Sequence, residues 1–255
     1  MKKKSYVKGA CTGLVILLLI SALAPQVYAQ SEPGVDTEGI GPSAVTMGSI
    51  VPVVTETGKI SLSVDGLGVY PANSGTIQVE KPAGATVRSA YMAAATTGFT
   101  NHRLADGDIM IDGVGIAWDI ETRSSISSWN YWADVTSIVK SKIDAAPAGR
   151  VDFTITEKSS DTYKIDGEIL AVIFDDPNQT TDNTIVLLFG AQDIAGDTFA
   201  IGLAEPIDTS DPNLVLDMSL GISFGYQRYG GGQYSIVEVN GVRLTTSAGG
   251  EDDGD

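Results

Sequence analysis

Short apolar runs separated by turn residues dominate the chain from Lys59 onward. Runs of this length, bounded by Gly, Asp and Asn, are typical of β-strands joined by tight turns. The expected strands cover 59–64, 76–80, 86–96, 108–111, 114–120, 151–157, 163–165, 168–174, 184–189, 198–203, 214–224, 234–239 and 242–246. Strands do not alternate with helices, so the pattern predicts an all-β fold: an antiparallel β-sandwich, jelly-roll-like, with one short helix.

Four turns share one chemistry. Asp-Gly occurs at 65–66, 112–113 and 166–167, and Asn-Gly occurs at 240–241. Both pairs tolerate the positive φ angles that a two-residue hairpin requires. We therefore expect a hairpin at each of these four positions.

Two runs, Ile169–Phe174 and Ile185–Phe189, are apolar on both faces. Because alternate residues of a strand point to opposite faces, such strands need cover on both sides. The expected centre of the core consists of Ile169, Ala171, Ile173, Val186 and Leu188.

One segment has helical spacing. Val135, Ile138, Val139 and Ile143 fall on one face, and Asp134 precedes them as a candidate cap. The helix is expected to end before Pro147, at a sheet edge or at one end of the sandwich.

The N-terminus has the three parts of an export signal. Four lysines precede an apolar run from Leu14 to Ala24, and Val27-Tyr28-Ala29 supplies small residues for cleavage before Gln30. The run is short for a membrane span and ends at Pro25, so no membrane insertion is expected after cleavage. We expect a signal peptide at 1–29, an N-terminal arm or linker at 30–57 and the sandwich at 58–255. Within the arm, residues 50–54 could add an edge strand that tolerates Pro52.

The charge is strongly acidic, with 16 Lys and Arg against 32 Asp and Glu, a net charge of −16. Removal of four lysines with the leader leaves 12 basic residues against 32 acidic ones, a net charge of −20. Nucleic acid is therefore not an expected partner, because its binding needs clustered Lys and Arg. The single cysteine, Cys11, lies in the leader, so the exported chain has no disulfide or thiolate metal site.

Catalytic signals are weak. His102 is the only histidine, and no Gly-x-Ser-x-Gly motif surrounds a serine. Two acidic residues could converge for glycoside hydrolysis, but spacing singles out no pair. We therefore name no catalytic residue, and we expect a protein that is not an enzyme.

One loop concentrates oxygen ligands between the two most apolar strands. Calcium takes six to eight oxygens from carboxylates, amides and carbonyls, which makes this loop a candidate site with no other cofactor expected. The candidate ligands are Asp175, Asp176, Asn178 and Asp182. The alternative is an ordinary polar loop with Asx turns. Asn178-Gln179-Thr180 is also an N-glycosylation sequon, so Asn178 is a candidate glycan acceptor.

Aromatic residues gather in two places. Trp129, Tyr131 and Trp132 precede the expected helix, and Tyr226 and Tyr229 precede a run of three glycines. Exposed, these five residues would form a platform on which a sugar ring stacks. The alternative is that they fill the core or anchor a loop.

Three stretches also resemble a known family. They are Lys81–Tyr91, Ala133–Val139, and Glu168–Phe174 continued through Asp175-Asp176-Pro177-Asn178 to Ile185–Phe189. Their order resembles the uncharacterised extracellular domain family numbered 3344, found in surface proteins of archaea and bacteria. The resemblance implies a secreted, cell-surface β-sandwich and supplies no catalytic residues.

Together these patterns predict a secreted or cell-surface structural or adhesive module without catalytic activity, whose partner is a surface protein or a glycan. A carbohydrate-binding module, stabilised by calcium, is the first alternative. An extracellular hydrolase is the second.

Overall fold

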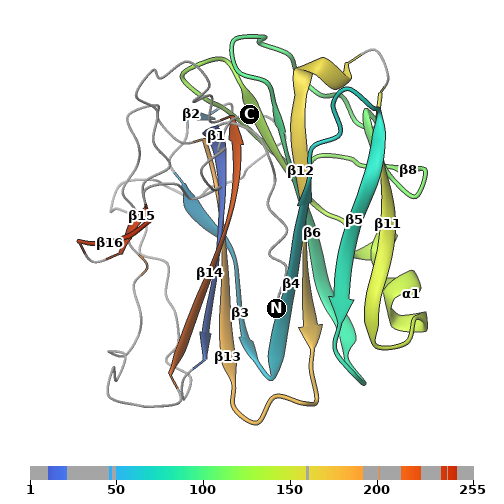
Figure 1. Ribbon diagram of the computed structural model, residues 1–255, viewed down its shortest axis with the longest axis vertical. Helices are drawn as coiled ribbons and strands as arrows, with labels where there is room; N and C mark the ends of the chain where they lie inside the picture. Colours follow the sequence, from blue (N-terminus) through green and yellow to red (C-terminus); the bar gives the residue numbers. More distant parts are fainter. Residues whose placement is uncertain are drawn as a thin grey trace, which may run out of the picture.

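Strands that are apolar on both faces need cover on both sides, and the fold supplies it by stacking three sheets (Figure 1). The computed structural model describes residues 11–21, 46–47, 50–158, 161–191, 201, 214–224, 237–239 and 241–245. It is mostly β, with antiparallel sheets and one α-helix, which confirms the predicted all-β sandwich class. The third layer is an addition to the two sheets that the sequence predicted.

The middle sheet has the strand order β2-β9-β10-β6-β12-β4. Its strands are β2 (Thr46–Met47), β9 (Ile120–Arg123), β10 (Trp129–Asp134), β6 (Thr86–Thr96), β12 (Ile165–Asp175) and β4 (Ile60–Leu67). All pairs are antiparallel except the short parallel pair of β2 with β9. Because β12 lies between β6 and β4, the apolar run of β12 occupies the interior of the molecule.

The second sheet covers one face of the middle sheet. Its order is β5 (Ser74–Lys81), β11 (Gly149–Glu157), β7 (Ile109–Ile111) and β8 (Val114–Gly115). Ile77 and Phe153 from this sheet pack with Met92, Val172 and Phe174 from the middle sheet.

The third sheet covers the other face of the middle sheet. Its order is β14 (Val215–Phe224), β1 (Cys11–Ser21), β13 (Asn183–Phe189) and β3 (Val51–Gly58). Ile185 and Leu187 of β13 pack with Ala171 and Ile173 of β12, whereas Leu188 faces away from the middle sheet. The apolar segment of the predicted leader thus lies between β13 and β14 in the full chain.

The core prediction is confirmed for four residues. Ala171, Ile173, Val186 and Leu188 are buried, whereas Ile169 is only half-buried beside the second core cluster. Within the expected arm, β3 is an edge strand paired with β13, and Pro52 lies beside a register shift in that pairing. The expected edge strand is therefore present.

The helix α1 (Thr136–Ala145) begins slightly later than expected, and Val135 occupies the N-cap position. The carboxylate of Asp134 still accepts a hydrogen bond from the Thr136 N–H at 2.8 Å. Val139 and Ile143 are the buried residues of the helix. Among the described residues no helix has both the length and the apolar character to cross a membrane.

Two of the four expected hairpins form. Asp112 and Gly113 adopt φ angles of 48° and 81° between β7 and β8, and β15 (Val237–Val239) pairs with β16 (Val242–Thr245). The prediction is wrong at 65–66 and 166–167, which lie inside β4 and β12. Asp65 instead pairs with Leu170 of β12, and its Oδ2 accepts a hydrogen bond from the Gln78 N–H of β5 at 2.8 Å.

Two strand predictions are also wrong in detail. Residues 163–165 overlap a short 3₁₀ helix, η1 (Thr162–Lys164), and 114–120 divides into β8, an irregular segment and the start of β9. Of the expected strand at 198–203, only Ile201 lies within the described residues. The first part of the strand expected at 234–239 lies outside them.

Candidate functional site

Three connections meet at one end of the middle sheet (Figure 1). They are residues 68–73 after β4, 97–108 after β6, and 158 with 161–164 before β12, and we call this region the loop end. Thr96 of β6 lies opposite Ile165, and Leu67 of β4 lies opposite Glu168, so the three strands reach this end together. A hydrogen bond from Thr97 N–H to Lys164 O at 2.8 Å links two of the connections, and one from Glu157 N–H to Asn73 O at 2.9 Å ties the third to the end of β11.

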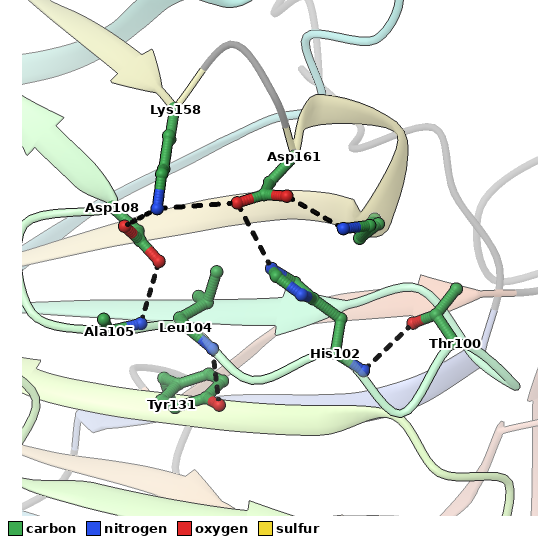
Figure 2. Close-up of polar contacts among 9 residues, drawn as sticks. Thr100, His102, Leu104, Ala105, Asp108, Tyr131, Lys158 and Asp161 are labelled. Atoms are coloured by element: carbon green, nitrogen blue, oxygen red, sulfur yellow. Dashed lines mark hydrogen bonds and ion pairs between the residues drawn. The ribbon is translucent and has the colours of Figure 1, made fainter.

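A charged cluster lies within the loop end (Figure 2). The carboxylate of Asp161 lies 2.9 Å from Lys164 Nζ, 3.8 Å from Lys158 Nζ and 3.9 Å from His102 Nε2. Lys158 Nζ also lies 3.2 Å from Asp108 Oδ1. The hydrogen bond from Lys164 lowers the pKa of Asp161, and His102 and Lys158 act in the same direction.

Buried groups fix the position of this cluster. Asp108 Oδ2 accepts a hydrogen bond from the Ala105 N–H at 2.9 Å, and the Lys158 N–H donates to Asp108 O at 2.8 Å. The Tyr131 hydroxyl lies 2.9 Å from the Leu104 N–H, which donates to it (Figure 2). Tyr131 therefore anchors the 97–108 connection from inside the core.

His102 lies beside Asp161 without a hydrogen bond between them. Burial lowers the pKa of His102 and outweighs the opposing effect of Asp161, which favours the neutral imidazole. At 3.9 Å the two groups are too far apart for a hydrogen bond. The neighbouring Thr100 hydroxyl donates to Thr97 O at 2.6 Å and accepts from the His102 backbone N–H. This geometry gives no support to nucleophilic catalysis.

Large exposed aromatic side chains stand on all three connections. Tyr70, Phe99 and Tyr163 expose 66%, 74% and 58% of their surface. The Phe99 and Tyr163 segments adjoin, because the Thr97 hydroxyl lies 3.3 Å from Tyr163 O. Solvent exposure of three aromatic side chains at one end of a sandwich is a feature of binding surfaces. Sequence reasoning missed them because each stands alone in its segment, so no local cluster marks them.

The aromatic platform predicted before the helix is wrong. Trp129, Tyr131 and Trp132 expose only 6%, 1% and 4% of their surface. Trp132 stacks on Tyr91 with ring centroids 5.2 Å apart, which leaves no face for a sugar. The alternative of core packing is therefore correct for these three residues. Tyr226 and Tyr229 lie outside the described residues.

The candidate calcium loop is held by its own hydrogen bonds. Asp176 accepts from the Asn178 N–H at 3.0 Å, from Asn178 Nδ2 at 2.8 Å and from Gln179 Nε2 at 3.0 Å. Burial raises the pKa of Asp176, but these hydrogen bonds outweigh it and leave the pKa lowered. Asp175 pairs with Arg88 at 2.9 Å, and the Lys59 ammonium donates to Gln179 O and Thr180 O.

These contacts match the polar-loop alternative. The lysine ammonium binds two carbonyl oxygens of this loop, and Asp182 is an exposed residue of the same loop. Within the described part of the chain, no group of three acidic, histidine or cysteine residues is arranged to hold a metal ion. Calcium binding by this loop stays a prediction without geometric support.

The sequon asparagine is also engaged. Asn178 is exposed, but its Nδ2 donates to Ala83 O at 2.7 Å and to Asp176 Oδ1 at 2.8 Å. A glycan would attach to this nitrogen, so it would have to replace at least one of these bonds. Glycosylation at Asn178 stays a prediction.

Comparisons of the chain with protein families, curated proteins and solved structures found no match. The resemblance to the family numbered 3344 therefore stays an expectation from the sequence. Any statement about function depends on the loop end itself.

Proposed function

We propose that the protein is an extracellular, non-catalytic β-sandwich module that adheres to a surface ligand through its loop end. The observation that carries the proposal is the exposure of Tyr70, Phe99 and Tyr163 on three connections at the same end of the middle sheet. The export signal in the sequence supports the extracellular location.

The chemistry of the loop end favours a glycan as the ligand. Sugar rings offer apolar C–H faces that pack on aromatic rings, and hydroxyl groups that need polar partners. Lys158 and Lys164, whose side chains are 54% and 27% exposed, supply such partners, and their pairing with the buried Asp161 balances charge. A neutral polysaccharide fits this surface better than nucleic acid, which the acidic chain repels. The carbohydrate-binding alternative is therefore part of the proposal.

A glycan array with the exported protein tests this proposal. The double variant Tyr70→Ala/Tyr163→Ala should lose at least about tenfold in affinity, because exposed aromatic anchors dominate binding energy. The matched control is Val242→Ala/Leu244→Ala, which removes exposed apolar side chains from β16 instead. The control should bind as the wild type does.

The outcomes separate the candidate functions. Binding that the aromatic double variant leaves unchanged would overturn the loop end as the adhesive surface. Binding to a cell-surface protein and to no glycan would keep the adhesive module but exclude the carbohydrate ligand. Turnover of a bound polysaccharide would favour the hydrolase alternative.

A further inference from the structure

Two buried glutamates from different sheets meet beneath the loop end. Glu157 is the last residue of β11 in the second sheet, and Glu168 lies in β12 of the middle sheet. They expose 1% and 0% of their surface. Each carboxyl group lies within interaction distance of the other, so the pair joins the two sheets.

The pair lacks a compensating donor. In the part of the chain that the structure describes, no N–H or O–H group donates to any of the four carboxylate oxygens. Two ionised carboxylates are both acceptors and repel each other. A hydrogen bond between them requires that one of them carries a proton.

The surrounding charged groups do not relieve the repulsion. Asp166 of β12 is a further acid acting on Glu157, and Asp65 of β4 already accepts the Gln78 N–H. The opposing residues on β6 and β7 are Ala94 and Ile109, which carry no charge.

The two ammonium groups of the neighbouring connection are engaged elsewhere. Lys158 Nζ contacts Asp108 and Asp161, and Lys164 Nζ contacts Asp161. His102, the titratable ring of that connection, faces Asp161. The glutamate pair therefore has no cationic partner among the described residues.

Burial also shifts the titration of this region. It raises the pKa of Glu157 to about 7, although the hydrogen bond with Glu168 opposes this rise and Asp166 adds to it. It raises the pKa of Glu168 well above its ordinary value, and the neighbouring Glu157 carboxyl adds to that rise. Burial raises the pKa of Asp166 to about 6, against the hydrogen bond from Thr97.

We propose that Glu157 and Glu168 share a proton that holds the second and middle sheets together, and that its loss loosens the loop end. The pair would act as a pH-sensitive latch beneath the loop end, the surface proposed for adhesion. The latch depends only on the burial and contacts of the two glutamates and does not require that the loop end binds a ligand. A carboxyl group that binds its proton more tightly when folded stabilises the fold fully below the unfolded pKa near 4.5. That contribution declines as the pH rises through about 7.

The test compares urea unfolding between pH 5 and 8 in the wild type and in Glu157→Gln/Glu168→Gln. In the wild type, the unfolding equilibrium constant should rise with pH by a factor that includes roughly a hundredfold from loss of the shared proton. The double variant should lack this part of the rise, because amide side chains pair without a titratable proton. Glu80→Gln, an exposed change on β5, is the matched control and should keep the wild-type profile. Equal pH profiles in the wild type and the double variant would overturn the proposal.

Two further measurements protect the result. Folded wild-type protein at pH 6.5 should show the infrared band of a protonated carboxyl group, and the absence of this band would overturn the latch. This measurement does not require that the double variant folds. Repeating the pH 8 unfolding with calcium and with chelator separates a proton from a cation. Stabilisation by calcium that the double variant abolishes would assign the pair to a metal instead.

Discussion

Gly167 shows how one residue decides whether a turn signal becomes a turn. Its φ is +151°, and a Cβ placed there would lie 2.3 Å from the carbonyl oxygen of Leu67. The close approach lets β12 continue beside β4 where an Asp-Gly pair suggested a hairpin. Local turn chemistry alone therefore cannot distinguish a hairpin from a strand that needs glycine for contact.

Substituting Gly167→Ala should destabilise the fold by more than about 2 kcal/mol, because a backbone clash adds to the strain of a positive φ. Gly113→Ala is the matched control: it has a φ of +81° but open space around its Cβ, so it should cost only about 1–2 kcal/mol. Urea denaturation measures both. Equal losses would show that the Leu67 contact adds nothing.

Ile173→Ala should cost about 2–5 kcal/mol, since it removes a fully buried side chain between the middle and third sheets. Ile120→Ala, at a residue that is 41% exposed, should cost less than about 1 kcal/mol. Thermal and urea unfolding provide the comparison. An unchanged midpoint for Ile173→Ala would contradict the core assignment.

The sequence could predict the core better than the site at this scale. Continuous apolar runs must be covered, so the burial of Ile173 and Leu188 follows from their neighbours in sequence. Burial of Trp132 and exposure of Tyr70 do not follow in this way, because both depend on which distant segments pack around them. The aromatic prediction therefore failed for a physical reason.

At the scale of elements, the helix α1 is joined to the sandwich by named polar contacts. Asp144 Oδ1 accepts the Val87 N–H of β6 at 2.7 Å, and the Thr136 hydroxyl accepts the Ala90 N–H at 2.8 Å. Buried Lys81 donates to Asp144 O and Ala146 O at 2.9 and 2.8 Å. A cation at the C-terminal end of the helix donates to carbonyl oxygens that have no partner within the helix. Its positive charge also interacts favourably with the negative end of the helix dipole.

Lys81→Met should therefore lower stability by about 1–3 kcal/mol, because it leaves two helix-end carbonyls without their charged donor. The control is Lys142→Met on the same helix, which breaks a partly exposed ion pair with Asp112 and a hydrogen bond to Asp152 O but keeps an apolar stem near Phe153, so it should cost less than about 1 kcal/mol. Circular dichroism during urea unfolding reports both. A larger loss for the control would contradict the capping role.

The elements were predictable in kind and less so in extent. The segment 86–96 is a strand as predicted, because its alternating apolar residues serve two cores. The strand prediction at 163–165 is wrong because the segment forms a short 3₁₀ turn, which the hydrogen bond from Lys164 N–H to Asp161 O closes at 2.7 Å. Such closure depends on local hydrogen bonds that apolar periodicity does not record.

At the scale of the whole molecule, layering explains the apolar content of the strands. The middle sheet is covered on both faces, so β6 and β12 carry apolar residues on both. The sequence predicted that coverage but indicated two sheets where three are stacked, since periodicity does not report which strands share a sheet. The loop end likewise arises only when segments far apart in the chain meet.

The position of β1 has a consequence if the predicted cleavage before Gln30 takes place. Thr184 of β13 and Leu216 of β14 both pair with Ile20, from opposite sides. Since β1 is antiparallel to both neighbours, β13 and β14 run parallel to each other. Cleavage before Gln30 would leave a gap one strand wide, with unpaired backbone groups on both of its edges.

We expect β14 to move by about 5 Å and pair with β13 once the leader is removed. The variant Thr184→Cys/Leu216→Cys tests this, since the cleaved chain has no other cysteine. The pair should form a disulfide in the exported protein and fail to do so in an uncleaved precursor that also carries Cys11→Ser. No disulfide in the exported protein would contradict the closure.

Proteolysis would then be a folding step as well as a release step. The precursor and the exported protein would share two sheets but differ in the hydrogen-bond partners of the third. The third sheet would then reach its final strand pairing only after signal peptidase has cleaved the leader, which takes place outside the cytoplasmic membrane.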